Sequence, residues 1–148
     1  MELYFFAWFG TVSLVLLSWQ DFRNNRIIDD RRNFFMFGVS AVIPALLGLG
    51  LIPILLHILI IFILRHYVIK YGVKFGFLGG GDISALFWAI MGLSWFGYFV
   101  LGAYFGYLFL LTGVYYGVKK IMKIKQPTPF MIVLLCSFVL TCVSFGLY

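Results

Sequence analysis

The chain alternates long apolar stretches with short polar ones. Apolar runs occupy residues 3–20, 34–51, 54–69, 83–97 and 98–118, and a last run follows Pro129 and ends at Tyr148. A bilayer core of about 30 Å takes roughly 20 helical residues per crossing. The pattern therefore predicts an all-α polytopic membrane protein with about six transmembrane helices, which form a single domain over residues 1–148. The first run is expected to be a retained helix, because Glu2 precedes it where a signal peptide has a basic region.

Composition supports the same class. Of the 148 residues, 64% are hydrophobic, 21% are aromatic and 11% are charged, and the mean hydropathy is +1.06. A soluble domain of this size has too little interior to hide so much apolar surface. We therefore expect an integral protein of the cell membrane, surrounded by lipid.

The charges predict an orientation. In a soluble protein the net charge of +6 would suggest nucleic acid, but here all eleven Lys and Arg residues fall on one side of a six-span arrangement. The positive-inside rule makes that side cytoplasmic and places both termini outside. Asp21 and Asp82 then lie on the cytoplasmic side, each at a membrane edge.

Two ionisable residues within the third run have ordinary interpretations. His57 lies well inside the run, and a neutral histidine bonded to a neighbouring helix is its commoner role. Arg65 lies near the end of the run and is expected to extend to the membrane surface.

Small residues in the later runs predict packing rather than chemistry. The pairs Gly102/Gly106 and Gly113/Gly117 have the spacing that lets helices approach closely. Cys136 and Cys142 lie six residues apart and so on different faces of a helix. We expect both cysteines to be packing residues, with no disulfide and no metal site.

The segment Gly79-Gly80-Gly81-Asp82 carries the clearest candidate chemistry. Three glycines end a basic, loop-like segment (71–81) and would let another backbone come close. Asp82 has two interpretations. It is an N-cap that accepts from the first free N–H groups of the next helix, or it is a catalytic acid, and the second interpretation requires a partner acid.

Asp21 is the candidate partner, because it closes the first run at the same predicted membrane face. An aspartic protease needs one ionised carboxylate to take a proton from water and one protonated carboxyl to polarise the scissile carbonyl. Two close carboxyl groups cannot both ionise cheaply, so they share one proton.

Three motifs resemble those of one enzyme family. Gly79-Gly80-Gly81-Asp82 matches the GxGD motif of the type IV prepilin peptidases and archaeal preflagellin peptidases. Asp21 is followed after four residues by Arg26-Ile27-Ile28-Asp29, where that family has Arg-Ile-Pro-Asn, and Pro127-Thr-Pro129-Phe130 resembles the start of the family's last span. The chain departs from the pattern at Ile28, Asp29 and Ser84, since many members carry Lys at the last position.

The resemblance implies an activity and a set of roles. It implies an aspartic endopeptidase that cuts the short basic leader (the class III signal peptide) from prepilin-like or preflagellin substrates, without cofactor or metal. Asp21 and Asp82 would be catalytic, Gly79, Gly80 and Gly81 would form a substrate-approach loop, and Arg26 and Asp29 would be supporting residues. The chain has no cysteine-rich zinc-binding insert, which implies a peptidase without methyltransferase activity.

Two other function classes stay open from the residues alone. A small transporter would need ionisable groups near the bilayer midplane, where the sequence offers His57. A non-catalytic membrane assembly protein would use Asp82 as a helix cap and Asp21 as a loop acid.

Overall fold

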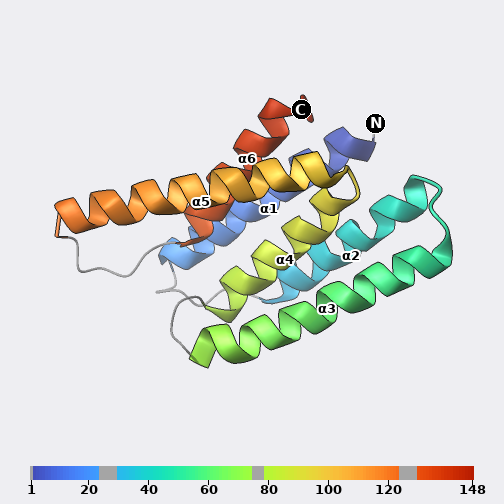
Figure 1. Ribbon diagram of the computed structural model, residues 1–148, viewed down its shortest axis with the longest axis horizontal. Helices are drawn as coiled ribbons and strands as arrows, with labels where there is room; N and C mark the ends of the chain where they lie inside the picture. Colours follow the sequence, from blue (N-terminus) through green and yellow to red (C-terminus); the bar gives the residue numbers. More distant parts are fainter. Residues whose placement is uncertain (1, 24–29, 75–78, 124–129) are drawn as a thin grey trace.

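The chain forms six α-helices, and no strand occurs in the residues that the structure describes (2–23, 30–74, 79–123 and 130–148 of a computed structural model). They are α1 (Glu2–Arg23), α2 (Asp30–Leu46), α3 (Leu51–Lys74), α4 (Gly80–Ser94), α5 (Tyr98–Ile121) and α6 (Phe130–Ser144). Successive helices run in opposite directions along the bundle (Figure 1). The predicted all-α class is confirmed.

Within the described residues, two helices are long and apolar enough, by length and composition, to cross a membrane. They are α3, over Leu51–Gly72, and α5, over Tyr98–Ile121, while α6 is a shorter apolar helix. The helices α2, α4 and α6 have 17, 15 and 15 residues, which corresponds to a rise of about 22 to 26 Å. A six-span arrangement therefore requires these three helices to begin below the membrane surface or to thin the bilayer around them.

The predicted boundaries shift at several points. The third helix continues to Lys74 rather than ending near residue 69, and α2 begins at Asp30 instead of residue 34. Pro53, which directly precedes the predicted third apolar run, lies in the first turn of α3. Proline is tolerated there because the first backbone N–H groups of a helix have no intrahelical acceptor.

The short helix α4 lies at the centre of the bundle. It packs against each of the other five helices, and its side chains from Ile83 to Leu93 are mostly buried. In Figure 1, α4 runs below α5 and above α3. The start of α4, where Asp82 lies, is consequently held by several neighbours.

An aromatic cluster ties α4 to α1 and α6. The rings of Phe6, Trp88 and Phe138 lie 5.7 to 6.4 Å apart in edge-to-face contacts, an arrangement that stabilises beyond the buried area alone. Two glycines make room for these rings. A Cβ at Gly92 would collide with the Phe6 ring, and one at Gly10 would collide with Phe138.

The glycine pairs of α5 have a different environment from the one predicted. A Cβ added at Gly102, Gly106, Gly113 or Gly117 would meet nothing within 4 Å. Among the described glycines, the tightest contacts are at Gly10 and Gly92, where a large ring lies opposite.

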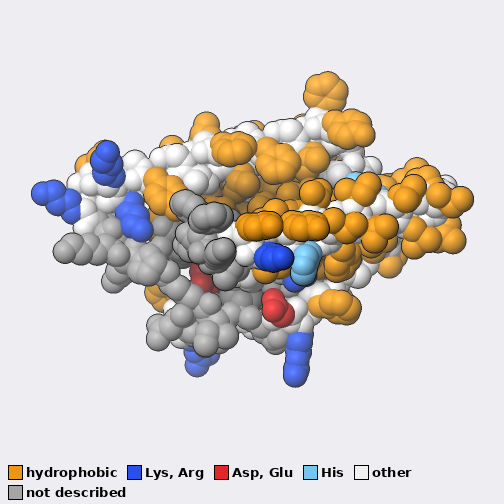
Figure 2. All heavy atoms as spheres, turned by 60° about the horizontal axis from the view of Figure 1, so that its bottom comes forward, with side chains coloured by type: hydrophobic (Ala, Val, Ile, Leu, Met, Phe, Trp, Pro, Cys, Tyr) orange, Lys and Arg blue, Asp and Glu red, His pale blue; other side chains and the backbone are white. Residues whose placement is uncertain are grey.

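The surface is dominated by apolar side chains, and the charges gather toward one end. Figure 2 shows a nearly continuous hydrophobic region on the right of the molecule and the Lys, Arg, Asp and Glu side chains of that face toward the left and below. Residues such as Phe22, Phe34, Tyr98, Phe99 and Phe109 are three-quarters exposed or more. Apolar exposure on this scale exceeds the patches that soluble monomers show.

Candidate functional site

The end of the bundle that holds the charges is formed by helix ends that are distant in sequence. The carboxyl ends of α1, α3 and α5 and the amino ends of α2, α4 and α6 lie toward this end, and α5 projects beyond the others (Figure 1). Asp21 lies in the last turn of α1, and Asp82 lies in the first turn of α4. The two candidate acids therefore reach the same end of the molecule, on helices that contact each other.

Asp21 is buried although its side chain is ionisable, with 8% of its surface exposed. Burying a carboxyl group is costly unless the group is bonded or protonated. Carboxyl groups removed from water in this way are common at functional sites.

Asp82 has a precise local role, and the N-cap interpretation is wrong in position. The N-cap of α4 is Gly79, and Asp82 is the third helical residue. Its Oδ2 accepts a hydrogen bond of 3.2 Å from the backbone N–H of Gly79, while its Oδ1 atom is buried. An acid here also benefits from the positive end of the helix dipole.

The glycine segment is a helix start rather than a loop. Gly80 and Gly81 belong to the first turn of α4, and Gly79 precedes it with φ −71° and ψ 154°. The segment therefore does not use the left-handed backbone that glycine permits. A Cβ at Gly80 would meet nothing within 4 Å, so space remains beside the backbone next to Asp82.

Asn33 on α2 fixes this helix start and was missed by the sequence interpretation. It is 1% exposed; its Nδ2 donates to the Gly81 carbonyl (3.3 Å), and its Oδ1 accepts from Trp88 Nε1 (3.2 Å). One buried amide thus joins the residue before Asp82 to the aromatic cluster. Asn33 ends the polar loop before the second apolar run, but nothing in that position predicted a partner 48 residues away.

Ser40 extends the same connection along α2. Its hydroxyl is 2.9 Å from the Met36 carbonyl and 3.0 Å from the Trp88 carbonyl. Asn33 and Ser40 thus each bond α2 to α4, at two positions along the helices.

Arg65 on α3 makes the second contact with the start of α4, and its predicted extension to the surface is wrong. Its Nε and Nη2 donate to Ser84 Oγ at 3.2 and 2.7 Å, and its guanidinium lies 5.4 Å from the centre of the Phe37 ring. Ser84 is fully buried. An arginine within an apolar run could have signalled an inward contact, because such residues usually face a bundle interior.

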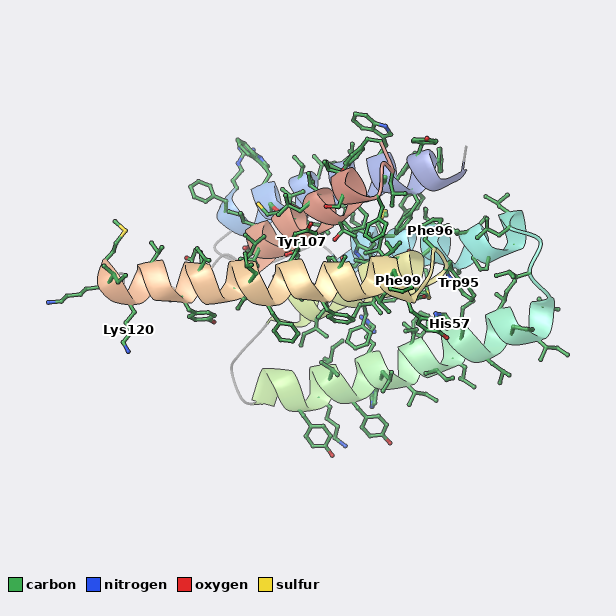
Figure 3. The ribbon with its side chains drawn as sticks, turned by 45° about the horizontal axis from the view of Figure 1, so that its top comes forward. His57, Trp95, Phe96, Phe99, Tyr107 and Lys120 are labelled. Carbon is green, nitrogen blue, oxygen red and sulfur yellow. The ribbon has the colours of Figure 1, made fainter. Side chains whose placement is uncertain are left out.

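His57 lies at the other end, away from both acids. Its Nε2 is 2.8 Å from Ser94 Oγ on α4, and its ring lies 4.3 Å from the Trp95 ring. The predicted bond to a neighbouring helix is confirmed. Figure 3 shows His57 beside Trp95, far from Lys120 at the opposite tip of α5.

The remaining candidates do not add to the described site. Arg26 and Asp29, proposed as supporting residues, and the prolines at 127 and 129 lie outside the described residues. Cys136 is exposed and Cys142 is buried on α6, as is expected for residues on different faces. No group of three metal-ligating side chains occurs among the residues that are described.

Comparison with known proteins supplies no relative. No protein-family model, no curated protein and no solved structure matches this chain.

Proposed function

We propose that this protein is a membrane-embedded aspartic endopeptidase that removes the short basic leader of prepilin-like or preflagellin substrates at the cytoplasmic membrane edge. The observation that carries the proposal is the convergence of Asp21 and Asp82 at one end of the bundle. These two acids come from the first and fourth helices, and Asp21 is buried. The resemblance of Gly79–Asp82 and Asp21–Asp29 to the family's motifs supports the same activity.

The proposed reaction uses both acids and one water molecule. One carboxylate takes a proton from water as the oxygen attacks the scissile carbonyl, and the other carboxyl gives its proton to the carbonyl oxygen. The resulting gem-diol collapses when the first acid protonates the leaving nitrogen and a hydroxyl proton returns to the second acid. The C–N bond breaks, and both acids regain their starting states, as general acid–base catalysis requires.

The proposed topology has six membrane spans with the charged end in the cytoplasm. The connections at the other end, residues 47–50 and 95–97, contain no Lys or Arg, which fits the positive-inside rule. A substrate with a basic leader and an apolar helix would place the leader at the charged cytoplasmic end and the helix in the membrane. Its scissile bond would then lie at the membrane edge, at the level of Asp82.

Co-expression with a candidate prepilin or preflagellin tests the activity. The wild-type chain should shorten the substrate by its leader and leave a free, unmethylated N-terminus, whereas Asp82→Asn should leave the substrate intact. Asp30→Asn is the matched control, because Asp30 is an exposed acid at the start of α2. A membrane-inserted Asp82→Asn variant that still cleaves would exclude the proposal and leave Asp82 with a helix-capping role.

Single-cysteine labelling tests the orientation. In a background without Cys136 and Cys142, positions 24 and 121 should be reached from the cytoplasm and position 96 from outside. Labelling of position 24 from outside would overturn the orientation and the catalytic interpretation together.

A further inference from the structure

Two apolar residues of the central helix α4 are partly exposed, although α4 has five neighbours. They are Leu86 and Ile90, and all other residues from Ile83 to Leu93 are buried. Asp82, which is also partly exposed, precedes Leu86 by four residues, as Leu86 precedes Ile90. Residues at this spacing lie on one side of a helix. The three residues form a strip (the α4 strip) that begins at the proposed catalytic acid and continues for about 12 Å along α4.

The α4 strip faces away from the side on which α1, α2 and α6 meet this helix. The ring of Trp88 packs against Phe6 of α1 and Phe138 of α6, and α2 bonds to its indole and to its carbonyl. Leu86 and Ile90 are each two residues from Trp88, which places them about 200° around the helix from it. The neighbours that remain to border the strip are α3 and α5, which lie below and above α4 in Figure 1.

The two helices that border the strip are not packed against each other. Within the described residues, no Cα atom of α3 lies within 8 Å of a Cα atom of α5. The position of α3 is fixed near each end of the strip, because Arg65 bonds to Ser84 and His57 bonds to Ser94. The apolar part of the α4 strip is therefore open to the lipid between α3 and α5.

We propose that the α4 strip binds the apolar helix of the substrate, which enters sideways from the lipid between α3 and α5. This inference rests on the proposed peptidase function and adds the surface on which the substrate docks. A leader-bearing substrate is an apolar helix preceded by a basic segment, and the strip is an apolar surface that ends at an acid. With the apolar helix on Leu86 and Ile90, the bond that precedes it lies at Asp82, and the basic leader reaches the charged end.

Photocrosslinking locates the docking surface without any cleavage. The chain carries Asp82→Asn, which keeps the substrate uncut, and p-benzoylphenylalanine at position 86 or 90. It is co-expressed with a candidate prepilin or preflagellin, the membranes are irradiated, and adducts are mapped by peptide mass spectrometry. Both positions should form adducts with the apolar segment of the substrate.

Val42 on α2 is the matched control position. It is 53% exposed and lies about 200° around α2 from Ser40, whose hydroxyl bonds to the Trp88 carbonyl of α4. Val42 therefore faces away from α4. Because α2 and α4 run in the same direction, it is level with Ile90 and meets lipid at the same depth.

The control decides the outcome of the crosslinking. Position 42 should give no more adduct than an unirradiated sample. Equal yields at positions 42, 86 and 90, or no adduct at 86 and 90, overturn the proposal. If the bulky residue prevents membrane insertion, Leu86→Cys and Ile90→Cys in a background without Cys136 and Cys142 can be labelled with a benzophenone maleimide after insertion, and the same outcomes apply.

Cleavage kinetics test the contribution of the strip to substrate binding. Leu86→Ala and Ile90→Ala should each raise KM by about fivefold with little change in kcat, because each removes part of an apolar contact made in the bound state. Val42→Ala should change neither constant. An unchanged KM in both strip variants overturns the docking surface.

The two experiments separate the docking surface from the proposed function. Leader cleavage by the wild-type chain without adducts at positions 86 and 90 would leave the peptidase function standing and exclude the α4 strip. Adducts at both positions from a chain that cleaves no leader would exclude the peptidase function and retain the strip as a binding surface for apolar helices. The absence of both cleavage and adducts would exclude both proposals.

Discussion

The two ends of the bundle are built differently. At the charged end, polar side chains cross between helices and hold the start of α4, through the buried Asn33 to Gly81 and the half-buried Arg65 to Ser84. At the other end, aromatic rings and glycines do most of the packing, and Phe6 contacts Phe96, Trp88 and Phe138. The first end places ionisable groups inside the bundle, and the second end supplies rigidity.

Substitutions at the two ends should therefore separate activity from stability. Removing a carboxyl group at the charged end takes away a reacting group, while the helices still pack. Enlarging a glycine at the aromatic end disturbs the packing of the rings, because close-packed interiors leave no space for an added methyl group.

The largest effect is expected from the two acids. Asp21→Asn and Asp82→Asn should each lower the rate of leader cleavage by at least about 10³-fold, and the double variant should be no slower than either single one, since residues that act in one step are not additive. The amide at position 82 can still accept from the Gly79 N–H, so the helix start should survive. Timed cleavage with purified protein measures the rates, and circular dichroism checks the fold. A double variant slower than the singles by the product of their effects would mean that the acids act separately.

The second effect is on stability at the aromatic end. Gly92→Ala places a methyl group against the Phe6 ring, which is held by three other rings. We expect a loss of about 1 to 3 kcal/mol in the free energy of unfolding, as for other overpacked sites, with unchanged cleavage by the folded fraction. Unfolding in mixed detergent micelles measures the change.

Gly102→Ala is the matched control for that substitution. Its Cβ would meet nothing within 4 Å, and alanine favours helix over glycine by up to about 1 kcal/mol. The two substitutions should therefore differ in sign. Equal destabilisation at both positions would contradict the contrast between a packed and an open glycine.

Much of the fold could be predicted from the pattern of apolar runs. Six runs gave six helices, and the alternation of direction then brought Asp21 and Asp82 to one end, because two whole helices, α2 and α3, separate them. The pattern did not predict the first turn of α4. Three glycines have poor helix propensity and indicated a loop, but the side chain of Asp82 bonds back to Gly79 and stabilises a helix from Gly80.

The sequence also did not predict the contacts between residues that are distant along the chain. Arg65 was expected at the surface because a long side chain near a helix end can extend there. Its direction depends on what lies opposite, and a buried hydroxyl on α4 is not visible in the sequence of α3. The same reason explains the glycines: those with a motif spacing on α5 face open space, while Gly10 and Gly92, which have no motif, lie under rings.

The third effect concerns the buried amide on α2. Asn33→Leu removes the acceptor of Trp88 Nε1 and the donor to the Gly81 carbonyl, and a buried polar group left without its partner costs about 1 to 3 kcal/mol. Because Gly81 precedes Asp82, we also expect a loss of about tenfold in kcat with little change in KM. Ser40→Ala is the control, since its bond to Trp88 lies further along α4 and should cost about 1 kcal/mol with unchanged kcat. Equal kcat losses in the two variants would show that general loosening of α2, rather than the position of Gly81, is responsible.

The smallest effect is expected at His57. Ser94 Oγ donates to the Met91 carbonyl at 2.8 Å, so it receives the bond from His57, and His57 must carry its proton on Nε2. Glutamine can donate from a similar position, and His57→Gln should therefore lower the free energy of unfolding by less than about 1 kcal/mol, the net value of one hydrogen bond. Leader cleavage and its pH profile should not change, because His57 lies at the end opposite Asp21 and Asp82.

Proteoliposome flux assays provide the complementary test. A transporter would use this ionisable group within the apolar region. An ion flux that disappears in His57→Gln would therefore favour transport at the His57 end over catalysis at the charged end.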